Sequence, residues 1–195
     1  MPEAPHKADG SRYRFLDLVD ADRATHVAVM RAGVAPRFED LAGWEFAGAN
    51  VNAASELIGV RKFKKGFYEG GAPRVAAGPT PFLQGYNVVC FQDGLYMAHR
   101  AKPSEEHPKR FGYYRVHAVV PGAPDSLYEN ALLLDYGLGA NGVSEATLLR
   151  DYLVQVYPDD RDLLLGHAFY ALPFGLRLSL GIFVLSRVNQ HDFKG

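Results

Sequence analysis

The sequence has little cysteine, little net charge and no long apolar run. Its 195 residues include a single cysteine, Cys90, so no disulfide can form within the chain. Lys and Arg number 21 against 22 Asp and Glu, and this balance argues against a general nucleic-acid-binding protein. The longest apolar stretch, residues 172–188, is interrupted by Pro173, Arg177 and Arg187. We therefore expect no nucleic-acid partner and no membrane span.

Familiar catalytic and metal-binding motifs are missing as well. The chain contains no glycine-rich phosphate loop, no Gly-x-Ser-x-Gly, no His-Glu-x-x-His and no zinc-type spacing of cysteine and histidine. No metal site is expected. Residues 1–10 are polar and lack the apolar run of a signal peptide, which together with the lone cysteine favours a cytoplasmic location.

Apolar residues make up 48% of the chain and aromatic residues 12%, enough for a substantial core in one domain. Residues 1–11 are rich in Pro, Ala, Lys and Asp and predict a disordered tail, and residues 12–190 predict a single domain. Acidic residues at the start and Gly33 at the end predict a helix at about residues 21–32.

After that helix the chain consists of short runs of β-forming residues separated by Gly, Pro and Asp. Asp93-Gly94 predicts a tight hairpin, residues 52–58 fit one helical turn, and residues 70–81 and 101–109 fit surface loops. With the strand that contains Trp44, the runs span residues 60–68, 85–92, 95–100, 110–120, 127–136, 148–157, 163–171 and 177–188.

An antiparallel sheet of this length removes its exposed edges by closing on itself. We therefore predict an all-β fold with minor α content. It is a closed or nearly closed antiparallel β-barrel of about eight to ten strands with a short N-terminal helix.

Two short segments resemble the lipocalin-like (calycin) β-barrels, in which a tryptophan on the first strand packs beside an arginine on the last. Here they are Gly43-Trp44 and residues 183–187, Phe-Val-Leu-Ser-Arg. The order of elements is also similar to bacterial proteins named for a GXWXG motif, whose chains close with a Leu-Gly segment, here Leu165-Gly166. The resemblance implies that Trp44 and Arg187 close one barrel end through stacking and hydrogen bonds to carbonyls. The alternative is a core tryptophan and an exposed arginine.

The run 110–120 offers the first candidate ligand contacts. Alternation places Tyr113, Arg115 and His117 on one face of this strand. If that face points inward, Arg115 and Tyr113 can bind a carboxylate in an apolar pocket. If it points outward, the same residues are solvated on the barrel exterior.

Two histidines lie on otherwise apolar strand faces, His167 beside Phe169 and His99 beside Met97. A buried neutral imidazole can act as an acid, a base, a haem ligand or a ligand anchor. The alternative is a core or interface histidine whose hydrogen bonds are satisfied.

Charged residues beside apolar runs suggest structural roles. Asp135 ends one run and Arg150 lies near the start of another, which predicts a bridge between adjacent strands. A catalytic Asp135 would need a partner that the sequence does not identify. The basic cluster Arg61, Lys62, Lys64 and Lys65 predicts a solvated edge strand, with binding of an anionic group as the alternative.

These patterns lead to one main functional hypothesis and three alternatives. The main one is a small hydrophobic or amphipathic, fatty-acid-like ligand in the barrel, bound by residues from the set Tyr113, Arg115, His117, His99 and His167. The first alternative is an isomerase, cyclase or hydratase that uses His167, His99 or Asp135. The second is a haem-binding barrel with His167 as the iron ligand, and apart from haem no cofactor is expected. The third is a structural or interaction protein, such as a homodimer, without a ligand.

Overall fold

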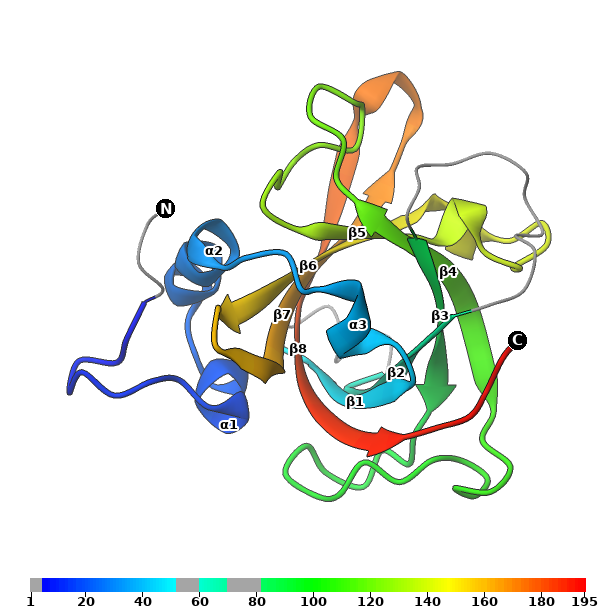
Figure 1. Ribbon diagram of the computed structural model, residues 1–195, viewed down its shortest axis with the longest axis horizontal. Helices are drawn as coiled ribbons and strands as arrows, with labels where there is room; N and C mark the ends of the chain where they lie inside the picture. The colour runs from blue at the N-terminus through cyan, green and yellow to red at the C-terminus, as the bar shows by residue number, and fades with distance from the viewer. Residues whose placement is uncertain (1–4, 52–59, 70–81) are drawn as a thin grey trace.

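The computed structural model describes residues 5–51, 60–69 and 82–195. In these residues eight antiparallel strands form a closed barrel in which each strand pairs with the next and β1 pairs with β8 (Figure 1). The strands are β1 Trp44–Asn50, β2 Lys62–Tyr68, β3 Phe82–Val89, β4 Arg110–Ala118, β5 Leu132–Asp135, β6 Leu149–Tyr157, β7 Asp160–Ala171 and β8 Arg177–Gln190. The predicted all-β barrel with minor α content is confirmed.

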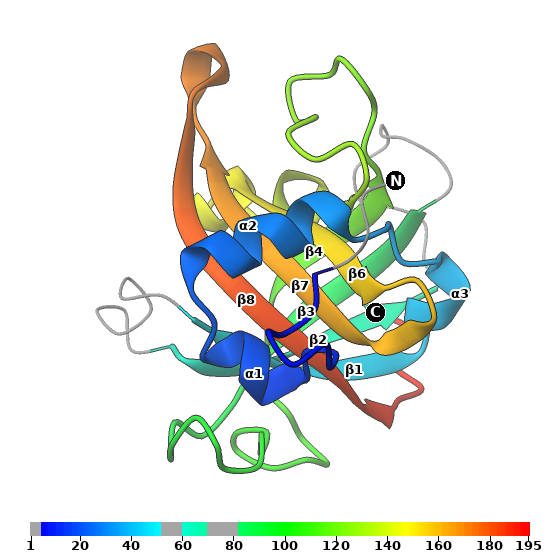
Figure 2. The same ribbon diagram turned by 90° about the vertical axis from the view of Figure 1, so that its left-hand side faces the viewer.

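Three α-helices precede the barrel: α1 Phe15–Val19, α2 Arg23–Ala32 and α3 Phe38–Leu41. The Asp22 carboxylate caps α2 by accepting a 2.8 Å hydrogen bond from the Thr25 backbone N–H. Helices α1 and α2 lie on the outside of the barrel along β6, β7 and β8, whereas α3 lies across one end (Figures 1 and 2). Among the described connections, three short 3₁₀ helices link strands: η1 Tyr136–Leu138, η2 Glu145–Leu148 and η3 Pro173–Gly175.

Apolar side chains form separate layers inside and outside the barrel. Leu132 and Leu134 belong to the interior cluster, whereas Leu133 belongs to the outer cluster that α1 and α2 cover. The strand pleat directs neighbouring residues to opposite faces, so both faces of these strands need apolar residues. This double covering explains the apolar run on β5.

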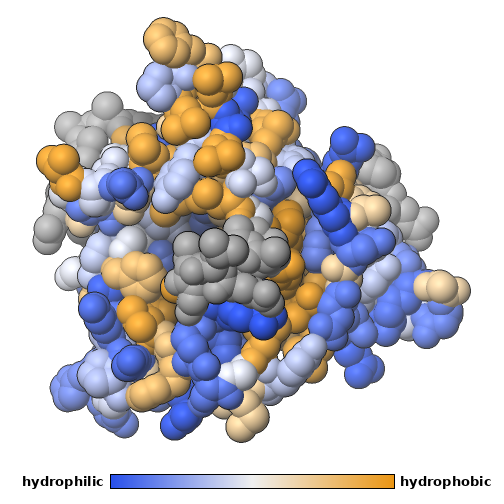
Figure 3. Space-filling view, turned by 180° about the vertical axis from the view of Figure 1, so that it is seen from behind, coloured by the Kyte–Doolittle hydropathy of each residue, from blue (hydrophilic) through white to orange (hydrophobic). Residues whose placement is uncertain are grey.

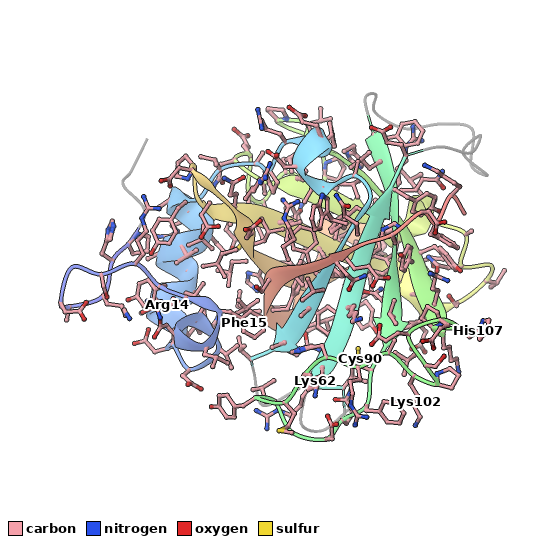
Figure 4. All side chains as sticks on the ribbon, turned by 60° about the horizontal axis from the view of Figure 1, so that its bottom comes forward. Arg14, Phe15, Lys62, Cys90, Lys102 and His107 are labelled. Atoms are coloured by element: carbon pink, nitrogen blue, oxygen red, sulfur yellow. The ribbon has the colours of Figure 1, made fainter. Side chains whose placement is uncertain are left out.

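The residues predicted as a strand at 95–100 form part of the loop 90–109, which links β3 to β4. The buried Lys62 ammonium holds this loop, because it donates to Asp93 Oδ1 at 2.6 Å and to the Met97 and Ala98 carbonyls at 3.2 and 2.9 Å. Figure 4 shows Lys62 close to Cys90, the first residue of the loop. The predicted hairpin at Asp93-Gly94 is wrong. The Asp93 carboxylate and the Met97 and Ala98 carbonyls accept hydrogen bonds from the Lys62 ammonium, and residues 95–100 do not form a strand.

The prediction of a solvated edge strand at the basic cluster is also wrong. Strand β2 lies between β1 and β3, and Lys62, Lys64 and Lys65 are 1%, 4% and 2% exposed. Lys64 Nζ donates to Glu105 Oε2 at 2.7 Å, so on the outer face two lysines attach the loop 90–109 to the barrel. Closure of the barrel turns a potential edge into a covered strand.

Strands β7 and β8 form a hairpin that projects beyond the barrel (Figure 2). Its tip exposes Leu172, Phe174 and Leu176. The helical turn expected at residues 52–58, the loop expected at 70–81 and residues 1–4 of the expected tail lie outside the described residues.

Candidate functional site

One end of the barrel is closed by Trp44 and Arg187. The Arg187 guanidinium carbon lies 4.5 Å from the centre of the Trp44 ring. Its Nη2 donates to the backbone carbonyls of Asp40 and Arg161 at 2.7 and 3.0 Å, and its Nε lies 2.6 Å from Asp162 Oδ1. Because α3 contributes the Asp40 carbonyl, the arginine joins the first strand, the last strand and the helix that covers this end.

A cavity of about 270 Å³ occupies the interior towards the opposite end. Most of its wall is apolar or aromatic. Figure 3 shows the molecule from the side opposite to Figure 1, and on this surface apolar side chains gather on several segments. Its described lining residues are Asn50, Val60, Phe63, Lys65, Asn87, Phe111, Gly112, Tyr136, Ala146, Leu149, Asp151, Ala168, Leu180, Gly181 and Phe183.

Four polar side chains in this wall form one hydrogen-bonded group, which we call the polar tetrad: Lys65, Asn87, Tyr136 and Asp151. Lys65 Nζ donates to Tyr136 Oη at 2.6 Å, to Asn87 Oδ1 at 2.9 Å and to Asp151 Oδ2 at 3.0 Å. The Tyr136 hydroxyl donates to the same Asp151 oxygen at 3.0 Å. The tetrad is therefore a buried ion pair held in place by an amide and a phenol.

Strand periodicity brings the charged members of the tetrad inside. On β2, Lys65 lies two positions from both Phe63 and Phe67 and therefore shares their interior face. On β6, Asp151 lies two positions before the interior residue Leu153 and shares its face in the same way. Tyr136 follows β5 directly in η1, where the Asp135 carboxylate accepts hydrogen bonds from the Gly137 and Leu138 N–H groups. That turn directs the phenol back towards β6.

Burial dominates the electrostatics of the tetrad. Lys65 Nζ lies 4.8 to 5.6 Å from the ring centres of Phe63, Tyr114, Tyr136 and Phe183. Desolvation lowers the pKa of Lys65, against the opposing effect of the Asp151 carboxylate. Desolvation, reinforced by the Asp151 charge, raises the pKa of Tyr136 well above its usual range, which makes its hydroxyl a hydrogen-bond donor at neutral pH.

Nearly all the hydrogen-bonding capacity of the tetrad is used internally. The Lys65 ammonium has three N–H donors, and each of them has an acceptor in the tetrad. The Asn87 amide donates to the Gly112 carbonyl at 3.0 Å and to Tyr136 Oη at 3.1 Å. Asp151 Oδ1 has no hydrogen-bond partner among the described residues. This carboxylate oxygen is therefore the acceptor left for a molecule in the cavity.

The structure resolves which face of β4 points inward. Tyr114 and Val116 belong to the interior cluster, so Tyr113, Arg115 and His117 lie on the other face, and none of these three lines the cavity. The Arg115 guanidinium carbon lies 3.5 Å from the centre of the Phe82 ring, and His117 Nδ1 is 2.8 Å from the Ala118 carbonyl oxygen. Of the two orientations that alternation allows, the outward one is present. The expectation that the residues are solvated there is wrong for Arg115 and His117, which are each only 4% exposed.

The two candidate histidines also lie outside the cavity lining. The imidazole of His99 hydrogen-bonds to the Gly48 carbonyl at 3.0 Å. His167 contacts Tyr128 Oη through Nδ1 at 3.0 Å and Ser179 Oγ through Nε2 at 2.8 Å. Both ring nitrogens of His167 are thus engaged by the side chains of Tyr128 and Ser179, away from the barrel interior.

Asp135 and Arg150 face each other across β5 and β6, and Arg150 Nη1 lies 3.0 Å from Asp135 Oδ1. Arg150 Nε also donates to Asp125 Oδ2 at 3.1 Å. The expected bridge between adjacent strands is present. Neither residue lines the cavity.

Burial lowers the pKa of His167 to about 4, and the nearby Arg23 and His26 add to the effect. We expect its imidazole to remain neutral at pH values where an ordinary histidine, with a pKa of about 6.5, is protonated. As the pH falls from 6.5 through 4, the unfolded chain takes up this proton first, so His167 lowers the free energy of unfolding in that window. The wild-type protein should lose more stability there than His167→Gln, and an NMR titration midpoint near 6.5 would contradict the assignment.

Reasoning from the sequence missed the polar tetrad, although part of the signal was visible. The alternation of β2 places Lys65 on the same face as Phe63 and Phe67, which marks it as a lysine among apolar residues. Its partners come from β3, η1 and β6, up to 86 positions further along the chain. No local pattern links residues so far apart.

The fold and the cavity define the class of protein: a closed, up-and-down antiparallel β-barrel with an interior cavity whose wall carries a buried ion pair. The chain has no significant match to a family model, a curated protein or a solved structure. Within the described part of the chain, no three histidine, cysteine or carboxylate side chains are grouped to hold a metal ion. None of the described helices combines the length and apolar character needed to cross a membrane.

Proposed function

We propose that this protein binds a small, neutral, mostly apolar molecule in the barrel, with the polar group of that molecule at Asp151. The apolar wall of the cavity favours transfer of such a molecule out of water. The eight-stranded barrel and the stacking of Arg187 on Trp44 support a lipocalin-like ancestry, in which the barrel interior is the ligand site.

The observation that carries the proposal is the internal saturation of the tetrad. Lys65 and Asp151 compensate each other's charge, and the Lys65 donors already have acceptors. A fatty-acid anion would bring an uncompensated negative charge into this desolvated space. A hydroxyl group, by contrast, can donate to Asp151 Oδ1 without adding charge. The proposed ligand is therefore a neutral amphipathic molecule such as an alcohol or a phenol, in place of the fatty-acid-like anion suggested by the sequence.

The cavity volume limits the size of the ligand. At about 270 Å³ it lies just below the range of roughly 300 to 1,000 Å³ found for drug-sized ligands. A compact molecule, with a single ring or a short chain, fits this space. A long acyl chain exceeds it.

Three molecules of nearly the same shape test the charge argument: benzyl alcohol, benzoate and benzylamine. In isothermal titration calorimetry at neutral pH, we expect benzyl alcohol to bind at least about tenfold more tightly than either ion, because each ion adds a net charge to the buried site. Equal or stronger binding of benzoate would contradict the proposal. If none of the three molecules binds, the proposal that the cavity holds a small neutral ligand is refuted for ligands of this shape.

Filling the cavity should abolish binding without unfolding the barrel. Ala168 lines the cavity from β7, so Ala168→Phe places a ring in the space that the ligand occupies. We expect benzyl alcohol to bind at least about tenfold more weakly to this variant. Ala171→Phe, on the same strand but outside the lining, is the matched control and should bind normally. Unchanged binding to Ala168→Phe would place the ligand elsewhere.

A further inference from the structure

We propose that Lys65 forms a reversible imine with a small aldehyde in the cavity and that Asp151 carries the proton between the amine and the carbonyl oxygen. This inference rests on the proposed function, because the same cavity must admit a small neutral molecule. It adds a chemical class, the aldehydes, and a covalent step to that function.

The first support is the position of the amine. Lys65 lines the cavity, its Nζ is surrounded by four aromatic rings, and its side chain is 2% exposed. An amine must lose its proton before it can attack a carbonyl carbon, and an apolar environment favours the neutral form. The desolvation that lowers the pKa of Lys65 acts in this direction. The titratable groups that face it are Asp151, Tyr136 and Tyr114.

The second support is the 3.0 Å contact between Lys65 Nζ and Asp151 Oδ2. At this distance the ammonium can pass its proton directly to the carboxylate, and the site has zero net charge before and after the transfer. The resulting carboxylic acid is a hydrogen-bond donor. A carbonyl ligand, which has no donor of its own, can accept this hydrogen bond from Asp151 when its oxygen lies beside the protonated Oδ2.

The reaction balances within the site. The neutral Lys65 amine adds to the aldehyde carbon while the carbonyl oxygen takes the proton from Asp151, and the added nitrogen then returns one proton to the carboxylate to give a neutral carbinolamine. Asp151 next protonates the hydroxyl group, the carbon–oxygen bond breaks, and water leaves. The product is an iminium cation beside the Asp151 carboxylate, so the original ion pair of Lys65 and Asp151 is replaced by one of the same net charge.

Strand β2 supplies two matched controls for this chemistry. Lys62 and Lys64 have side chains that are 1% and 5% exposed, like Lys65, but they lie on the outer face of the barrel. Their ammonium groups bind Asp93 and Glu105 and do not line the cavity. Burial alone is therefore common to all three lysines, whereas contact with the cavity is specific to Lys65.

The test uses benzaldehyde with sodium cyanoborohydride, which donates hydride to the iminium carbon and fixes the adduct as a secondary amine. Intact mass and peptide mapping of the full chain at neutral pH should show a single benzyl group on Lys65. We expect it to form at least about tenfold faster than an adduct on Lys62, Lys64 or any surface lysine. Adducts spread evenly over the surface lysines, or absent from Lys65, would overturn the proposal.

A double variant addresses the risk that loss of Lys65 alone unfolds the barrel. Lys65→Met with Asp151→Leu removes both charges together, keeps the volume similar and should lose the fast adduct while retaining the barrel. A fast adduct that persists in this folded variant would also overturn the proposal.

Parallel titration with benzyl alcohol separates the two proposals. Binding of benzyl alcohol without an adduct on Lys65 would refute the imine and leave the proposed function standing, whereas failure of both would refute both. If both are right, benzyl alcohol should compete with benzaldehyde and slow the labelling of Lys65 but not that of surface lysines.

Discussion

Replacing Asp151 with alanine is expected to lower the free energy of unfolding by about 3–5 kcal/mol. The change removes the carboxylate 3.0 Å from Lys65 Nζ and leaves a buried ammonium with only the neutral oxygens of Asn87 and Tyr136. An unpaired charge in this apolar interior costs far more than the lost contact itself. Urea unfolding followed by circular dichroism measures the effect.

Two further variants define what the loss of Asp151 means. Asp159→Ala removes an exposed ion pair with Arg12, whose side chain is 51% exposed, and should leave the stability nearly unchanged. The double variant Lys65→Met with Asp151→Leu should recover most of the loss, because apolar residues can replace a buried pair. A loss for Asp151→Ala as small as that for Asp159→Ala would show that Lys65 is not held as a buried cation.

Replacing Arg187 with alanine is expected to open the end of the barrel at α3 and to lower the free energy of unfolding by about 2–4 kcal/mol. The change removes the stacking on Trp44 and both hydrogen bonds to the Asp40 and Arg161 carbonyls. Trp44 is the single tryptophan of the chain, so its fluorescence reports this end directly. We expect a red-shifted emission in the folded variant, together with an earlier urea midpoint.

Arg161→Ala is the matched control for this arginine. The Arg161 side chain is 64% exposed, and its backbone carbonyl, which accepts from Arg187, remains in the variant. Stability and Trp44 emission should both stay close to those of the wild type. Equal effects of the two arginine variants would contradict a closing role that is specific to Arg187.

The barrel itself could be predicted from local patterns. Apolar alternation and turn residues marked all seven strands that follow β1 and the helix α2, and closure follows because a long antiparallel sheet has edges to cover. The exception among the predicted runs, residues 95–100, is a loop because Lys62 binds its carbonyl groups and Asp93. A lysine on a neighbouring strand could not be linked to that loop from the sequence.

The candidate site was harder to predict than the fold. Tyr113 and Arg115 were reasonable candidates because their strand has an aromatic residue on either face, and alternation alone cannot say which face is inward. The bridge between Asp135 and Arg150 was accessible because both lie at the ends of neighbouring apolar runs. Lys65 was obscured by the three basic residues around it, which made the whole segment look solvated.

The sequence by itself determined the strand periodicity, the helix α2 and the paired apolar faces, because these depend on residues close together in the chain. Only the tertiary structure decided which residues meet. Barrel closure sets the register of all eight strands at once and brings Lys65 and Asp151, 86 positions apart, within 3.0 Å. A shift of one residue in either strand would place that side chain on the outer face, so the polar tetrad exists only as a consequence of the closed barrel.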